Sequence, residues 1–222
     1  MTSSELLPKS EDVRLSCAFI PDAEKRGEVL VLFAFLEILR DIPERTTDPL
    51  MGEIRLRWWY EAIEEIEQGR AVRYHPLTEA LKAMIATHDL SPKDFLDLIE
   101  GQMPLLDKGA LRIKDALGVV DRGEAPLFRM AANILGEAAD LTDIARLHGM
   151  TRIKATRGLS DAGEVEFAHL KREAQKAAKN LSASLMPLAL PSSLADIYWH
   201  GRVPGPLTKR FRLFWSFVTG RI

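Results

Sequence analysis

The sequence predicts an all-α protein, and three observations support this fold class. Apolar residues recur along most of the 222-residue chain at the spacing that lines one face of an α-helix. The alternation of apolar and polar residues that marks a half-buried strand is almost absent. Proline and glycine stand at the breaks between the helical segments. Together these features predict a single-domain helical bundle over residues 1–222.

Local signals set the order and the limits of the helices. Asp22 is placed to cap the second helix, and Pro92 after Ser91 is suited to the first turn of the fifth. Ser91 with Asp94 approximates a capping box. The predicted helices cover residues 10–18, 22–42, 48–68, 76–88, 91–106, 109–118, 124–137, 141–158, 164–186, 191–201 and 207–219.

The second and third helices carry the clearest core signal. Residues 29–36 are apolar on nearly all sides of the second helix, which predicts a central position for it. The third helix has one apolar stripe, with two tryptophans that we expect to anchor the core. This stripe consists of Met51, Ile54, Trp58, Ala62 and Ile66, with Trp59 and Ile63 beside it.

Composition and charge narrow the class of protein. The hydrophobic fraction of 46% and the charged fraction of 28% are typical of a folded globular chain. A net charge of −2 gives no reason to expect a nucleic acid or an anionic membrane as partner. The single cysteine, Cys17, excludes an internal disulfide and favours a cytoplasmic location. The first residues resemble no targeting peptide, and the apolar run 29–36 is too short to span a bilayer.

Carboxylates at the end of the second helix are candidate Mg²⁺ ligands. Glu37 and Asp41 share a helix face, and Glu44 follows one turn later. Mg²⁺ prefers such oxygen ligands and usually also binds substrate phosphates. The alternative is that Arg40 forms ordinary surface ion pairs with Glu37 and Glu44.

A second acidic group and one basic group are further candidates. Asp161, Glu164 and Glu166 form the acidic group, although Asp161 and Glu164 are equally suited to the N-terminus of the helix that follows. The basic group could clamp a diphosphate, and the alternative is a solvated helix face. The basic group consists of Arg146, Arg152, Lys154 and Arg157.

The last predicted helix is amphipathic and basic. It carries an apolar stripe that is a candidate contact surface for a partner protein or a membrane. The alternative is that this stripe closes the core of its own domain. The stripe contains Phe211, Phe214, Trp215 and Val218, flanked by Lys209, Arg210, Arg212 and Arg221.

Motifs of other enzyme classes are not found. The sequence contains no GxSxG, P-loop, GxGxxG or HExxH motif, and its five histidines lack metal-ligand spacing. Serine, cysteine and nucleotide chemistry are therefore not indicated.

Several segments resemble squalene/phytoene synthase-like proteins. The segment Arg55–Trp59, with its two adjacent tryptophans, is the most specific of them. The similar segments are Arg26 with Leu32–Phe35, Gly52–Trp59, His75–Pro76, Pro126–Ala132 with Leu135–Gly136, and Leu185–Pro191 through Tyr198. The resemblance is thus spread over most of the chain.

This resemblance implies an isoprenoid-synthase fold with a central cavity that binds isoprenyl diphosphates through Mg²⁺. Active members carry two aspartate-rich motifs on facing helices and join two prenyl diphosphates head to head. The first motif would fall on residues 40–44, where Arg40 replaces an expected aspartate. The second would fall near residues 153–158, where no aspartate occurs before Asp161. Arginine and lysine in these places invert the charge of a metal site.

The pattern is closer to a degenerate branch of the family, which includes proteins that resemble assembly factors of respiratory complex I. We therefore expect a non-catalytic protein that binds a partner protein or an isoprenoid lipid, in the cytoplasm or peripheral to the inner membrane. The alternative is an Mg²⁺-dependent prenyltransferase with a reduced metal site, and a third hypothesis is a purely structural role in a larger assembly. In the enzyme, Asp41, Glu44, Asp161 and Glu164 would hold Mg²⁺, and Arg40, Arg152, Lys154 and Arg157 would hold the prenyl diphosphate.

Overall fold

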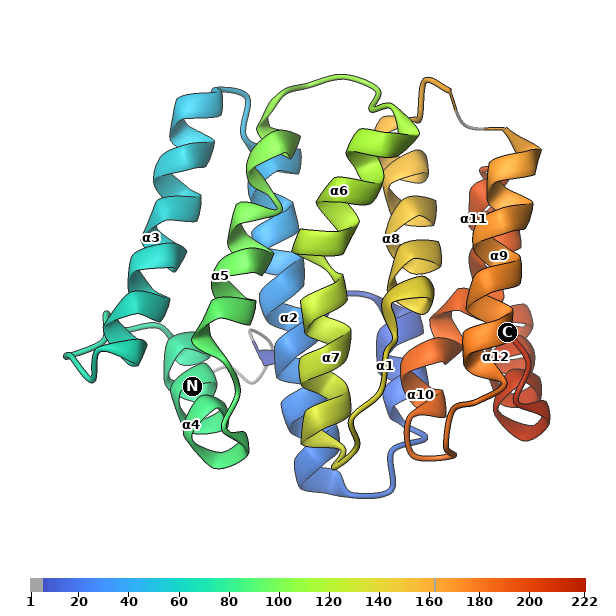
Figure 1. Ribbon diagram of the computed structural model, residues 1–222, viewed down its shortest axis with the longest axis horizontal. Coiled ribbons are helices and arrows are strands. Elements are labelled where there is room, and N and C mark those ends of the chain that lie inside the picture. The colour runs from blue at the N-terminus through green and yellow to red at the C-terminus, as the bar shows by residue number, and fades with distance from the viewer. Residues whose placement is uncertain (1–5, 162) are drawn as a thin grey trace.

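The computed structural model describes residues 6–161 and 163–222, and this part of the chain forms helices and no strand (Figure 1). The predicted all-α class is therefore confirmed. None of the helices in these ranges is long and apolar enough to cross a membrane. The elements are α1 (Glu11–Cys17), α2 (Ala23–Arg45), α3 (Pro49–Glu67), α4 (Pro76–His88), α5 (Pro92–Glu100), η2 (Met103–Leu106), α6 (Ile113–Gly123), α7 (Ala125–Ile134), α8 (Thr142–Arg157), α9 (Glu164–Ala178), α10 (Met186–Ala189), η3 (Leu190–Leu194), α11 (Ala195–Trp199) and α12 (Pro206–Thr219).

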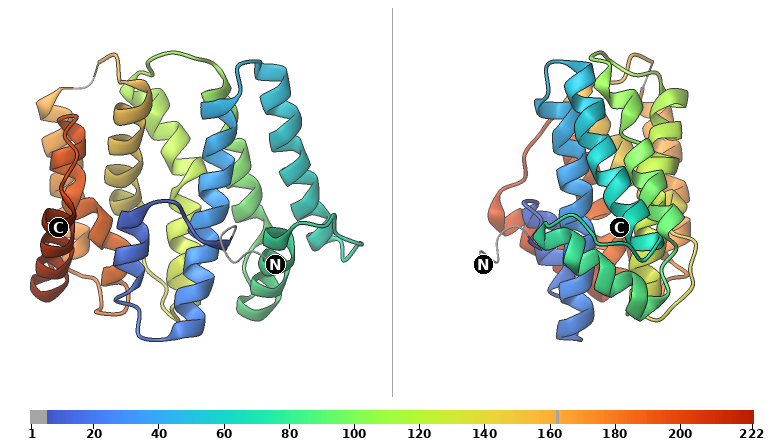
Figure 2. Two further views of the ribbon diagram at one scale, coloured as in Figure 1. Left: turned by 180° about the vertical axis from the view of Figure 1, so that it is seen from behind. Right: turned by 90° about the vertical axis from the view of Figure 1, so that its left-hand side faces the viewer.

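The long helices stand side by side, with α3 at one edge of the bundle and α9 at the other (Figure 1). Helix α2 lies in the middle and contacts α1, α3, α4, α5 and α7. Helix α8 packs between α6 and α9. Helices α1 and α12 lie on the far side of the bundle, where they contact each other and η3 (Figure 2).

Helix α2 is the central element that its composition predicts. The Asp22 carboxylate caps it by accepting hydrogen bonds from the N–H groups of Glu24 (2.9 Å) and Lys25 (3.1 Å). Phe35 is fully buried and meets the Trp59 ring edge-on, with 5.4 Å between ring centroids. The helix continues through Pro43 to Arg45, three residues beyond the predicted end at residue 42.

Helix α3 buries a different stripe from the predicted one. Met51 and Ile54 are 44% and 54% exposed, so their expected place in the core is wrong. Gly52 faces the core instead, because Leu106 of η2 lies where a β-carbon would be, 2.2 Å from its ideal position. The buried residues of α3 are Gly52, Leu56, Trp59, Ala62 and Ile63.

Several predicted boundaries are also corrected. The predicted capping box is absent: the Ser91 side chain makes no capping hydrogen bond, and the Asp94 carboxylate pairs with Arg129 at 2.6 Å. Helix α5 ends at Glu100, and α9 ends at Ala178. The segment predicted as a helix over 109–118 is α6, shifted to 113–123, and residues 191–201 divide between η3 and α11.

Candidate functional site

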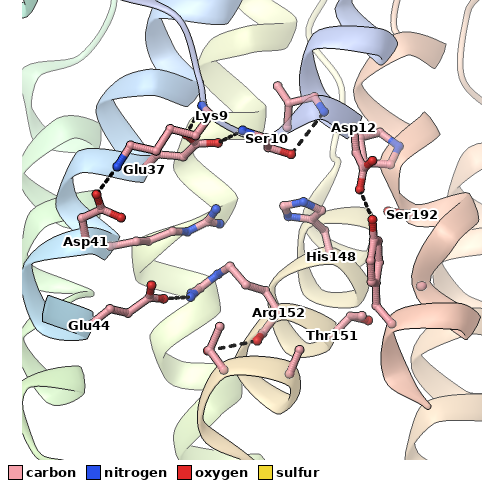
Figure 3. Close-up of a pocket in the computed structure, with 17 residues that line it drawn as sticks. Lys9, Ser10, Asp12, Glu37, Asp41, Glu44, His148, Thr151, Arg152 and Ser192 are labelled. Atoms are coloured by element: carbon pink, nitrogen blue, oxygen red, sulfur yellow. Dashed lines mark hydrogen bonds and ion pairs between the residues drawn. The ribbon is translucent and has the colours of Figure 1, made fainter. Parts of the chain in front are cut away.

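A cavity of 360 Å³ lies between α1, α2, α8, η3 and α11 (Figure 3). Helices α2 and α8 supply most of its charged side chains, while its apolar part comes from small residues such as Val13, Ala155 and Ala195. Segments far apart in the sequence therefore meet at one site. The lining residues are Lys9, Ser10, Asp12, Val13, Glu37, Arg40, Asp41, Glu44, His148, Thr151, Arg152, Ala155, Thr156, Pro191, Ser192, Ala195 and Tyr198.

A buried ion cluster lies at this cavity, where Arg40, His148 and Arg152 line the wall and Glu124 lies behind them. The Glu124 side chain is fully buried and lies 2.6 Å from Arg40 Nη2 and 2.8 Å from Arg152 Nη2. His148 Nδ1 is 3.6 Å from the same carboxylate. Gly149 of α8 makes room for it, since a β-carbon there would lie 2.6 Å from Glu124 Oε2. The expectation that Arg40 forms surface pairs with Glu37 and Glu44 is wrong, because Arg40 is buried against Glu124.

The charges in this cluster hold one another in their ionised forms. Burial alone raises the pKa of Glu124, but the neighbouring Arg40 and Arg152 outweigh it and hold that pKa well below its usual range. Burial, together with the charge of Arg152, lowers the pKa of Arg40 to about 10. Arg40 therefore still carries its charge at neutral pH. Glu124 was not among the residues that the sequence marked, because nothing near it in the chain distinguishes it from an ordinary helix-start residue.

The acidic residues at the end of α2 are bound by other parts of the same chain. Glu37 accepts hydrogen bonds from the backbone N–H groups of Lys9 and Ser10, and the Lys9 ammonium pairs with Asp41. These contacts hold the segment before α1 across the cavity wall (Figure 3). Glu44 lies 3.4 Å from Arg152 Nη1.

Asp12 is bound in the same way on the other side of the cavity. Lys209 of α12 lies 3.0 Å from it, and the Tyr198 hydroxyl donates a hydrogen bond to it. Burial and this contact raise the pKa of Tyr198 above its usual value, so the phenol stays protonated. The four carboxylates that line the cavity, of Asp12, Glu37, Asp41 and Glu44, thus each have partners within the chain.

The second predicted acidic group lies elsewhere. Asp161 accepts a hydrogen bond from the N–H of Ile113 (2.7 Å), so it caps α6 and not the helix that follows it. Glu164 lies 3.3 Å from His200. Neither residue lines the cavity, so the structure does not bring them together with Asp41 and Glu44.

The predicted basic residues also separate. Arg40 and Arg152 line the cavity, but Lys154 donates to the Trp199 carbonyl (2.6 Å) and lies over its ring. Arg157 donates to the backbone carbonyls that end η2. Lys154 and Arg157 therefore hold neighbouring elements in place and do not reach the cavity.

The residues at the cavity do not fit an Mg²⁺ cluster. Two arginines lie among the carboxylates, and those carboxylates already have partners. Over residues 6–161 and 163–222, no three histidine, cysteine, aspartate or glutamate side chains form a group that could hold a metal ion. A cluster of Mg²⁺ ions requires several free oxygen ligands, which this arrangement does not offer.

The apolar stripe of α12 lies on the surface. Phe211, Phe214 and Trp215 are 66%, 54% and 58% exposed, while Leu213 on the same helix is buried. The interpretation that this stripe closes the core is therefore wrong. These three residues remain a candidate contact surface.

Comparison with known proteins gives two results. Residues 7–153 match the family model described as squalene/phytoene synthase. The chain is 23% identical over 156 residues to human "NADH dehydrogenase (ubiquinone) complex I, assembly factor 6" and 22% identical to the bovine protein of the same name. Each match covers 70% of this chain and 45% of the relative, so the chain spans a little less than half the length of these relatives.

Proposed function

The chain belongs to the squalene/phytoene synthase family, and we propose that it is a non-catalytic member that binds a partner protein or an isoprenoid lipid. We further propose that it serves in the assembly of a respiratory complex. The two relatives are by name assembly factors of complex I, which supports this task. One cluster of buried apolar side chains extends from Val13 to Leu213, which supports the proposal that residues 1–222 form one domain.

The observation that carries the proposal is the pairing of charges at the cavity. Arg40 stands where the family resemblance expects an aspartate, and it is fixed by the fully buried Glu124. Lys9 and Arg152 neutralise Asp41 and Glu44. Recruiting these carboxylates to a metal would break both ion pairs and bring Mg²⁺ next to two arginines, Arg40 and Arg152, whose positive charges oppose the binding of a cation.

The cavity itself is suited to a lipid with an oxygen-bearing head. Arg40 Nε and Ser192 Oγ belong to lining residues, are buried, and have no hydrogen-bond partner in the described part of the chain. Buried polar atoms are nearly always satisfied, so an acceptor on a bound molecule would account for both. The volume of 360 Å³ is near the lower end of the range for small-molecule sites.

The alternative is a prenyltransferase that condenses isoprenyl diphosphates head to head. One observation favours it: Asp41, Glu44, Arg40 and Arg152 do line the same cavity. It requires Lys9 and Arg152 to release both carboxylates to Mg²⁺ ions.

The first test is an assay for turnover. The purified protein is incubated with farnesyl or geranylgeranyl diphosphate and Mg²⁺, and the products are analysed for inorganic diphosphate and coupled hydrocarbon. We expect neither. Turnover that is lost in Asp41→Asn/Glu44→Gln, but kept in Asp161→Asn/Glu164→Gln, would establish the alternative.

The second test is complementation. Deletion of the gene in its source organism is expected to lower the amount of assembled complex I, measured on native gels. The Asp41→Asn/Glu44→Gln variant should restore assembly as well as the wild type does, because the proposed task does not use a metal. A deletion that leaves complex I unchanged would contradict the assembly role.

The third test addresses the ligand. Farnesol without Mg²⁺ is expected to raise the melting temperature in a concentration-dependent way, since a ligand that binds only the native state stabilises it. Ser192→Ala should reduce this shift, and a variant of the distant Ser91, Ser91→Ala, should not. A rise in melting temperature that farnesyl diphosphate causes only in the presence of Mg²⁺ would instead support the prenyltransferase alternative.

We also propose that the protein works in the cytoplasm, at the surface of a membrane. The only cysteine, Cys17, is buried and unpaired, which suits a reducing compartment. The exposed aromatic residues of α12 support contact with a membrane.

A further inference from the structure

The outer face of α12 carries a stripe of large apolar side chains, here called the aromatic stripe and made of Phe211, Phe214, Trp215 and Val218. Each is more than half exposed. Their spacing places them on one side of the helix, because residues three and four apart are neighbours. A contiguous exposed patch of this kind marks an interaction surface, whereas single exposed apolar residues do not.

A row of cations lies at the end of this helix. Arg172 and Lys176 are exposed on one side of α9, and the exposed Lys179 follows directly after the helix. Together with Arg221, just beyond α12, they line a cleft of 370 Å³. In the part of the chain that the structure describes, none of these four cations has an ion pair. Their charge therefore remains available for a partner outside the protein.

Helices α9 and α12, which carry these two features, lie at the same edge of the bundle (Figure 2). The sequence of α12, Pro206–Thr219, contains no aspartate or glutamate. Helix α9 carries three glutamates, so the positive charge of this edge is local to the four unpaired cations, on a chain whose net charge is −2. The overall charge conceals it, which is why composition alone gives no hint of an anionic partner.

We propose that this edge docks on a bilayer that contains anionic lipids, with the aromatic stripe in the interface and the cation row at the phosphates. The inference rests on the proposal that the protein works at a membrane, and it does not depend on whether the cavity is catalytic. Aromatic residues suit the boundary between headgroups and acyl chains, and unpaired lysines and arginines suit a negatively charged surface. A second copy of the chain fits less well, because it would bring one positive edge against another.

The docking helix is a fixed part of the fold. Lys209 of α12 is half-buried and lies 3.1 Å from Glu11 and 3.0 Å from Asp12, which lines the cavity. Phe217 stacks on Phe19 with 4.6 Å between ring centroids. Docking through the stripe therefore places the whole domain on the surface with the wall of the cavity close to α12.

The test uses the full chain and vesicles of phosphatidylcholine with or without phosphatidylglycerol, separated by sedimentation. We expect binding to the anionic vesicles, weak binding to pure phosphatidylcholine, and loss of binding at high salt, because screening shortens the reach of the charges. No prenyl diphosphate or partner protein is added, so the result is independent of the turnover and complementation tests.

Two sets of variants separate the features. Phe211→Ser/Phe214→Ser should lower the binding constant about tenfold or more, and Arg172→Gln/Lys176→Gln/Lys179→Gln should do the same on anionic vesicles only. The matched controls change exposed apolar residues of α3, Leu50→Ser/Ile54→Ser, and exposed cations elsewhere, Arg70→Gln/Lys82→Gln/Lys114→Gln. The controls should bind as the wild type does.

Brominated lipids locate the inserted residue. They should quench the fluorescence of the wild type and not that of Trp215→Phe, which keeps the apolar ring and should still bind. Absence of binding to anionic vesicles, or equal losses in test and control variants, would overturn the proposal. So would a dimer in solution that Phe211→Ser/Phe214→Ser abolishes, because the stripe would then belong to a second copy.

Discussion

At the cavity, Arg40 and Arg152 lie within 2.8 Å of a fully buried carboxylate, and the surface carboxylates around them are paired as well. At the α9–α12 edge, Arg172, Lys176 and Lys179 are exposed and have no ion pair in the described part of the chain. The positively charged side chains are thus paired with carboxylates at the cavity, whereas at the α9–α12 edge they are exposed and unpaired. Cations that are satisfied inside a protein stabilise one arrangement, whereas unpaired cations on the surface are available to bind. We therefore infer a structural role for the first group and propose a binding role for the second.

The largest effect is expected from Glu124→Gln. This change keeps the shape of the side chain but leaves two arginines around an uncharged group, which should lower the free energy of unfolding by about 3–5 kcal/mol. Urea denaturation measures the loss. A variant that unfolds as the wild type does would show that the cluster is not the structural centre we infer.

A compensating variant provides the control for this change. Arg40→Met/Glu124→Gln/Arg152→Met removes all three charges, so no buried charge is left without a partner. We expect it to be more stable than Glu124→Gln alone, because apolar replacements of a buried ion cluster are often neutral.

The next effect concerns the close approach of α8 to the cluster. A β-carbon at Gly149 would lie 2.6 Å from Glu124 Oε2 and 2.7 Å from Val120 Cγ2, so Gly149→Ala should cost about 1–3 kcal/mol of unfolding free energy. Gly118, within α6, has open space around it. Gly118→Ala should therefore stabilise the protein by about 0.5–1 kcal/mol, and the two melting temperatures should move in opposite directions.

Acid should weaken the cluster gradually. The pKa of Glu124 in the folded protein lies well below the value of about 4.3 for an unfolded glutamate. Its ionised form therefore contributes stability that is fully present above that unfolded value and is lost as the pH falls towards the folded pKa. The stability difference between the wild type and Glu124→Gln should shrink below about pH 4.5, by up to about 1.4 kcal/mol per pH unit. A difference that stays constant down to pH 3 would contradict the lowered pKa.

The smallest effect is expected at the aromatic stripe. Phe214→Ser should change the free energy of unfolding by no more than about 0.5 kcal/mol, because the ring is 54% exposed and contributes little to the core. Leu213→Ala, on the inward side of the same helix, should cost about 2–5 kcal/mol. An equal loss of unfolding free energy in the two variants would mean that the aromatic stripe packs against the domain.

Much of the fold was predictable because helical periodicity is a local property of the sequence. The continuous apolar run of α2 predicted its central place. The cap was predictable because Asp22 directly precedes the first residue of the helix. The errors concern long-range contacts. The stripe of α3 that is buried depends on the contact between Leu106 and Gly52. The role of Asp94 depends on its ion pair with Arg129. No local pattern contains such information.

The sequence by itself determined the all-α class, the family, and the inference that Arg40 replaces an aspartate of the first metal-binding motif. Each of these depends on the identity of residues within short segments. Only the tertiary structure decided which charges meet. In the structure Arg40 pairs with Glu124, and Asp161 caps α6. Asp41 and Glu44 line the same cavity. The tertiary structure also turned the aromatic stripe outward. The physical reason is that the state of a charge or an apolar ring is set by its neighbours in space, and those neighbours come from distant parts of the chain.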